Sequence, residues 1–156
     1  MSTLRRLFGV NAEDIKENVI ITPFLNLEYF ARSASFKKAK GFLFETLTQK
    51  ELSVVKTGVG ASFVGDAVMY LADTPCRRLY FIGSCAGLSP YEVGDIICVE
   101  KAFAGESFSE LLRNNAIDTS SCIVPENDLS DEFLEFCNGI GKYKENCSLL
   151  LGKQSA

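Results

Sequence analysis

Two short stretches of this sequence combine glycines with small side chains in a way that suits ligand binding. The first, residues 57–61 (Thr-Gly-Val-Gly-Ala), follows an apolar segment and precedes a helical pattern. Glycines at a strand exit let a ligand approach the backbone closely, and the first N–H groups of the next helix face it. The alternative interpretation is a turn without a ligand, because glycines often serve only to reverse the chain.

The second stretch, residues 83–87 (Gly-Ser-Cys-Ala-Gly), follows a strand-like run over 78–82. In open α/β sheets, ligands bind at the carboxyl ends of strands. Ser84 has no histidine to activate it, since the chain contains none, so we interpret it as a hydrogen-bond donor and not as a nucleophile. On spacing alone, a tight turn without a ligand explains the stretch equally well.

Composition excludes several classes of function. The absence of histidine removes Ser-His-Asp and Cys-His catalysis and histidine-ligated metals, and we expect no metal site. None of the six cysteines forms a Cys-x-x-Cys pair, which favours reduced thiols in a cytoplasmic protein. A net charge of −4 argues against nucleic-acid binding. No apolar run approaches the roughly 20 residues that span a bilayer, so we expect no membrane partner.

Periodicity and breakers predict alternating strands and helices. The strands are expected at 18–22, 41–47, 51–57, 78–82, 94–100, 123–124 and 147–151, with a hairpin turn at 48–50. Helices are expected at 3–16, 25–33, 61–72, 107–114 and 128–140, with a loop over 118–130. This alternation predicts one α/β layered domain over residues 1–156.

Four pieces of the sequence, in order, resemble the nucleoside phosphorylase family. They are the two glycine turns, Val93-Gly-Asp-Ile-Ile97 and residues 102–107 (Ala-Phe-Ala-Gly-Glu-Ser). That family includes uridine phosphorylase, hexameric purine nucleoside phosphorylase and the methylthioadenosine/S-adenosylhomocysteine nucleosidases. The resemblance implies a phosphorylase/hydrolase-like α/β fold with three layers, in which helices flank a mixed central sheet.

The resemblance also implies which residues contact a nucleoside. The first turn would line the ribose and its 5′ side with Gly58, Val59 and Gly60. The second turn would line phosphate, ribose and base with Ser84, Cys85, Ala86 and Gly87. We therefore expect the two turns to lie at neighbouring strand tips and to form half of a nucleoside pocket together. Ser84 would donate to phosphate, which would be a co-substrate in a protein without a cofactor.

The sequence departs from the family at its charged positions. Phe81 stands where phosphorylases carry an arginine, and residues 22–25 (Thr-Pro-Phe-Leu) replace an arginine-bearing phosphate loop. A phosphate dianion without charge-assisted donors is poorly held. Glu28 lies within about one residue of the glutamate with which nucleosidases activate water. Its alternative interpretation is an exposed helix residue.

The family's C-terminal half brings a methionine-glutamate pair and an aspartate or asparagine that protonates or polarises the leaving base, so the resemblance implies a chain truncated at its C-terminus. The expected function is N-glycosidic cleavage of nucleosides in purine or pyrimidine salvage. The alternative is a non-catalytic nucleoside-binding or structural relative, and whether this chain is itself an enzyme stays open. The expected partners are a nucleoside or nucleobase and further copies of the chain, as a cytoplasmic homo-oligomer. The sequence also leaves open whether the base is a purine or a pyrimidine, and whether phosphate or water is the attacking group.

Overall fold

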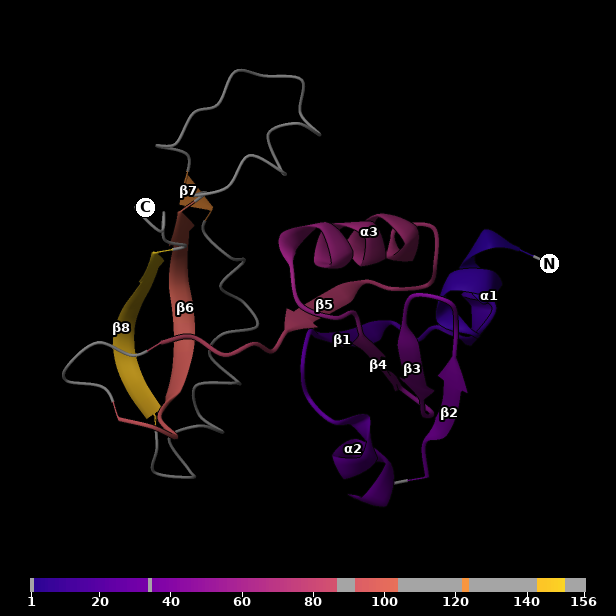
Figure 1. The fold of residues 1–156 in the computed structure, drawn as a ribbon, viewed down its shortest axis with the longest axis horizontal. Helices are drawn as coiled ribbons and strands as arrows, with labels where there is room; N and C mark the ends of the chain where they lie inside the picture. The colour runs from indigo at the N-terminus through magenta and orange to yellow at the C-terminus, as the bar shows by residue number, and fades with distance from the viewer. Residues whose placement is uncertain (1, 34, 87–91, 104–121, 124–142, 151–156) are drawn as a thin grey trace. The chain divides into compact units, whose positions relative to one another are not determined.

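A computed structural model describes residues 2–33, 35–86, 92–103, 122–123 and 143–150 (Figure 1). The chain divides into two compact units, Met1–Ser84 and Cys85–Ala156, and each is described by itself. We expected a single domain over residues 1–156, and that expectation stays a prediction.

The first unit is built on a five-stranded mixed sheet in the order β2-β3-β4-β1-β5. Its strands are β1 (Asn18–Thr22), β2 (Lys37–Lys40), β3 (Glu45–Thr48), β4 (Leu52–Lys56) and β5 (Arg78–Phe81). β1 pairs in parallel with both β4 and β5, whereas β2 and β3 add an antiparallel edge. The central position of β1 explains its apolar run over 19–21, because parallel strands are covered on both faces.

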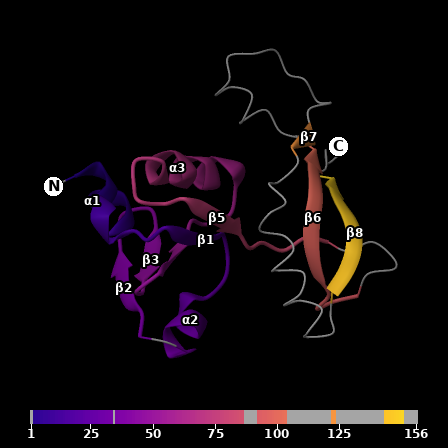
Figure 2. The ribbon, with the colours of Figure 1, turned by 180° about the vertical axis from the view of Figure 1, so that it is seen from behind.

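Helices cover both faces of this sheet. They are α1 (Thr3–Phe8), α2 (Leu27–Ser33) and α3 (Ala61–Leu71), with a 3₁₀ turn at Ala12–Asp14. In Figures 1 and 2, α1 and α3 lie on one side of the sheet and α2 lies on the other. The predicted α/β fold, with helices flanking a mixed sheet, is therefore confirmed.

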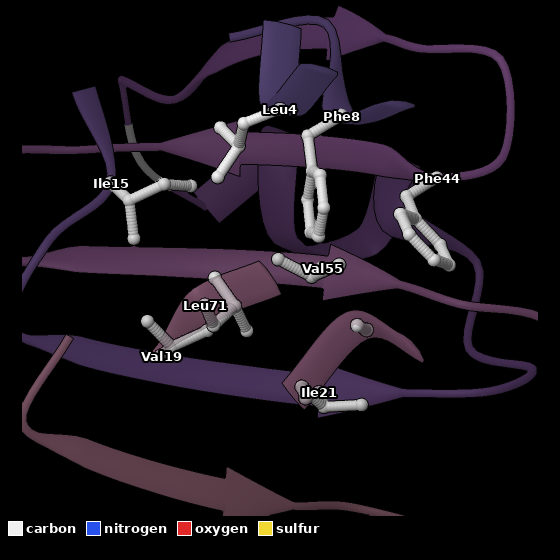
Figure 3. Packing of buried hydrophobic residues seen from close by; sticks show 9 residues of the cluster. Leu4, Phe8, Ile15, Val19, Ile21, Phe44, Val55 and Leu71 are labelled. Atoms are coloured by element: carbon white, nitrogen blue, oxygen red, sulfur yellow. The ribbon is translucent and has the colours of Figure 1, made fainter. Parts of the chain in front are cut away.

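Two apolar clusters hold the layers together. The larger joins α1 and α3 to the sheet through Leu4, Phe8, Ile15, Val19, Ile21, Phe44, Val55, Ala67 and Leu71 (Figure 3). Within it, the rings of Phe8 and Phe44 lie 4.6 Å apart between centroids. The smaller cluster seats α2 on the opposite face through Leu27, Leu47 and Val54. Burying each large side chain contributes about 1.5–3 kcal/mol, so these contacts fix the layers that position the strand ends.

The expected strand at 41–47 begins only at Glu45, because residues 41–44 close the end of α1 instead. The amides of Phe42, Leu43 and Phe44 donate to the last carbonyls of that helix, at 2.8–3.3 Å. The Thr46 hydroxyl donates to the Phe8 carbonyl at 3.0 Å. These bonds satisfy acceptors that every helix end leaves free. The expected helix over 3–16 correspondingly stops at Phe8.

The strand β2 was not predicted, since its Lys-Lys-Ala-Lys sequence looks like solvated surface. Lysines on an edge strand discourage pairing with another chain, which gives this composition a structural role.

The second unit contains a three-stranded sheet with β6 (Ile96–Phe103) in the middle. β6 pairs antiparallel with β7 (Cys122–Ile123) and parallel with β8 (Tyr143–Leu150). β8 starts four residues before the strand expected at 147–151. The polar run over 144–146 interrupts the apolar pattern, so the sequence did not predict this earlier start. The helices expected at 107–114 and 128–140 lie outside the described residues. So does the loop expected over 118–130 apart from β7, which lies one residue ahead of the short strand expected at 123–124. No helix in the described ranges is long and apolar enough to cross a bilayer.

Candidate functional site

The carboxyl ends of β4, β1 and β5 lie side by side at one edge of the first sheet. Thr22 at the end of β1 is in register with Lys56 at the end of β4. Ile21 is in register with Phe81 at the end of β5. Both glycine turns therefore leave the sheet at the same edge, which is where α/β sheets bind ligands.

The first turn connects β4 to α3 and is fixed beside β1. The Thr57 amide donates to the Thr22 carbonyl at 3.1 Å. Gly58 and Gly60 then adopt φ values of +88° and +128°, which L side chains rarely adopt. A Cβ on Gly58 would meet no atom within 4 Å, and Val59 between the glycines is 77% exposed. The turn thus presents open backbone to solvent.

The helix that follows this turn begins without a side-chain cap. Gly60 is the N-cap of α3 and supplies no side-chain acceptor for the first amides of the helix. The Val64 amide donates to the Gly60 carbonyl at 3.3 Å, which starts the helical ladder. The amides of residues 61–63 precede that ladder, so they can donate to oxygen atoms of a ligand.

Two buried threonines form hydrogen bonds with the backbone of the loops that follow β1 and β4. Thr22 is fully buried and its hydroxyl accepts a hydrogen bond from the Leu25 amide at 3.3 Å. Thr57 is 2% exposed, and its hydroxyl donates to the Gly58 carbonyl at 3.0 Å. No sequence signal indicates the role of Thr22, because that role depends on the pairing of β1 with β4.

The second turn leaves β5 along the other side of β1. The Ile82 amide donates to the Ile21 carbonyl at 2.9 Å, which extends the pairing by one residue. A Cβ on Gly83 would lie 2.7 Å from the Phe81 ring, so glycine there lets the ring fold over the turn. Ser84 follows, with its side chain exposed.

The placement of the two turns agrees with the sequence prediction in one respect and corrects it in another. They lie at the same edge of the sheet, as expected. They do not occupy adjacent strand tips, because β1 lies between β4 and β5. Two strand spacings amount to roughly 10 Å, so a ligand that touches both turns must cross the end of β1 at Thr22.

The remaining residues of the second turn fall elsewhere. Cys85 and Ala86 begin the second unit and are exposed there, and Gly87 lies outside the described residues. The roles of all these residues in binding stay predictions.

Glu28 forms an exposed ion pair on the α2 side of the sheet. Its carboxylate accepts a hydrogen bond from the Lys38 ammonium on the edge strand β2. That hydrogen bond, and then the attraction between the charges, lowers the pKa of Glu28 below its usual value. The pair accounts for Glu28 as a surface residue that ties α2 to β2. Its role in activating water stays a prediction.

The described cysteines and carboxylates do not form a metal centre. In the ranges that the structure describes, no three histidine, cysteine or acidic side chains gather as metal ligands would. Cys76 and Cys85 are free thiols. Burial raises the pKa of the Cys76 thiol, which disfavours its thiolate form.

Comparison with solved structures identifies proteins of the same fold. AMP nucleosidase from Bacteroides thetaiotaomicron superposes with a TM-score of 0.76 at 19% identity, over 90% of this chain and 59% of that chain. Purine nucleoside phosphorylase from Toxoplasma gondii, solved with immucillin-H, gives 0.73 at 16% identity, over 94% and 64%. Uridine phosphorylase from Vibrio fischeri, solved with 6-hydroxy-1-naphthoic acid, gives 0.66 at 16% identity, over 87% and 55%.

The sequence itself matches no protein-family model and no curated protein. The chain spans between 55% and 64% of the length of the three structures named above. All three are nucleosidases or nucleoside phosphorylases, and this chain has the α/β fold that they share.

Proposed function

We propose that the edge formed by the ends of β4, β1 and β5 binds a nucleoside for cleavage of its N-glycosidic bond. One observation carries this proposal. The two glycine turns, far apart in sequence, flank the end of β1 at one edge of the sheet. The fold shared with three enzymes of nucleosides and nucleotides supports the same assignment.

The residues at this edge are suited to binding and orienting a nucleoside. The amides of residues 61–63 at the start of α3 can donate to ribose oxygens, and the open backbone at Gly58 admits close approach. The Ser84 hydroxyl can donate from the other side of β1. Cleavage passes through an oxocarbenium-like state, so holding the sugar in a fixed orientation is the contribution we assign to these loops.

The cellular setting belongs to the same proposal. We place the reaction in purine or pyrimidine salvage in the cytoplasm, where the free thiols of Cys76 and Cys85 would stay reduced. We also propose a homo-oligomer, since Phe63 and Met69 on α3 expose large apolar side chains.

Calorimetric titration with inosine, adenosine and uridine tests the binding site. Ser84→Ala should weaken binding about fivefold to tenfold, the effect of one lost hydrogen bond. Ser35→Ala is the matched control, because Ser35 is an exposed serine that precedes the edge strand β2. Failure of all three nucleosides to bind the wild-type chain at millimolar concentration would refute the proposal.

Release of free base, followed by chromatography, tests the cleavage. The reaction is run with and without inorganic phosphate, so that phosphorolysis and hydrolysis are distinguished. Binding without release of base in either buffer would retain the nucleoside site and reject the enzyme.

A further inference from the structure

Lys56 ends β4 at the edge that carries both glycine turns. It is in register with Thr22 of β1 on one side and with Glu45 of β3 on the other. Val54, two residues earlier, packs into the α2 cluster. Since side chains alternate along a strand, Lys56 extends from the same face as Val54, one step nearer the carboxyl edge. The side chain is partly buried there.

The carboxylate in register with Lys56 on the neighbouring strand pairs with a different lysine. Glu45 lies directly opposite Lys56, yet its carboxylate pairs with Lys40 of β2 at 3.6 Å. Lys40 is also directly opposite Glu45, on its other side, so the three side chains form one row across the sheet. Among the residues that the structure describes, Lys56 makes no ion pair. The row therefore carries one uncompensated positive charge, on the side of the candidate site.

The ends of β1 and β5, on the other side of Lys56 from Glu45, are uncharged. β1 ends in the buried Thr22, and β5 ends in Phe81, which is 57% exposed. Phe24, after β1, is 42% exposed and is also apolar. Among the residues that end β4, β1 and β5, Lys56 is the one cation. An anion bound across the end of β1 would therefore pair with the Lys56 ammonium.

We propose that Lys56 binds a phosphate group of the ligand, either inorganic phosphate or the 5′-phosphate of a nucleoside monophosphate. This inference rests on the proposed nucleoside site and assigns its charge preference to one residue. The ammonium donates charge-assisted hydrogen bonds to phosphate oxygens, which are stronger than bonds between neutral groups. The neighbouring amides at the start of α3 add donors to the same edge.

Calorimetry with adenosine and AMP, each with and without inorganic phosphate, tests the role of Lys56. AMP should bind the wild type at least about tenfold more tightly than adenosine if the 5′-phosphate is the ligand group. If free phosphate is the ligand group, phosphate should instead strengthen adenosine binding by a similar factor. Lys56→Met should abolish whichever enhancement is found, and a cooperative thermal unfolding transition, followed by circular dichroism, shows that the variant is folded.

Lys37→Met is the matched control, because it removes the same charge from the opposite end of the sheet, where Lys37 is paired with Thr48. It should leave the phosphate enhancement intact. An enhancement that survives in Lys56→Met, or the absence of any enhancement in the wild type, would overturn the role of Lys56 while the nucleoside site stands. A wild-type chain that binds neither adenosine nor AMP would refute the nucleoside site itself.

Discussion

Replacing Gly41 by alanine should destabilise the first unit far more than the same change at Gly58. A Cβ on Gly41 would lie 2.0 Å from the Leu7 carbonyl oxygen and 2.5 Å from the Phe8 amide nitrogen. These are backbone atoms at the end of α1, so no side chain can rotate away. The loop over 41–44 would have to withdraw by about an ångström or more to reach an ordinary contact distance of about 3.5 Å.

That withdrawal breaks the bonds that close α1. The amides of Phe42, Leu43 and Phe44 would lose their acceptors on the helix, at about 1 kcal/mol each. The Phe44 ring, 1% exposed and packed on Phe8, would also lose part of its burial. The total is about 3–6 kcal/mol, a large share of the roughly 5–15 kcal/mol that stabilises a typical domain.

At Gly58 the same methyl group meets nothing within 4 Å, so only the cost of positive φ remains. That cost is about 1–2 kcal/mol, partly offset by the lower entropy of the unfolded chain.

Thermal unfolding followed by circular dichroism separates the two variants. For a unit of this size, 1 kcal/mol corresponds to about 4–8 °C in Tm. Gly41→Ala should therefore lower Tm by at least about 12 °C, or prevent folding, and Gly58→Ala by about 4–8 °C. Equal shifts in the two variants would refute the argument that the 41–44 loop is packed against the end of α1.

Two other predictions concern interactions that the sequence did not reveal. Thr46→Val keeps the shape of the side chain but removes the donor to the buried Phe8 carbonyl, so chemical denaturation should show a loss of about 1–3 kcal/mol; an unchanged midpoint would contradict that hydrogen bond. An ordinary glutamate has a pKa of about 4.3. Carbon NMR titration should give Glu28 a lower pKa, because Lys38 donates a hydrogen bond to its carboxylate. The stabilising contribution of this pair is then present above the usual glutamate range and is lost as the pH falls through the lowered pKa. Lys38→Met should return the Glu28 pKa to its usual value, and a Glu28 pKa that is the same in both proteins would exclude the pair in solution.

The elements with strong local signals were predicted from the sequence. α3 was expected over 61–72 and spans Ala61–Leu71, since a glycine turn precedes its broad apolar face. β1 and β5 were expected from short apolar runs, which are typical of strands in a parallel sheet. Both glycine turns follow such strands, so their common edge could be inferred from strand direction.

The elements that depend on distant contacts were not predictable in the same way. Residues 41–44 look like a strand, but the free carbonyls at the end of α1 recruit them into a turn. β2 is a strand because it pairs with β3, although three of its four residues are lysines. The position of β1 between the two turns, and the row in which Glu45 pairs with Lys40 and not with Lys56, are properties of register. A one-residue shift in register would change them without changing the sequence pattern.

Amide NMR spectra recorded during addition of a nucleoside test the central claim most directly. We expect the signals of Gly58, Gly60 and Ser84 to shift together along one binding curve, while that of Lys37 at the opposite end of the sheet stays in place. Shifts confined to one of the two turns, or to neither, would contradict a nucleoside site that spans the end of β1.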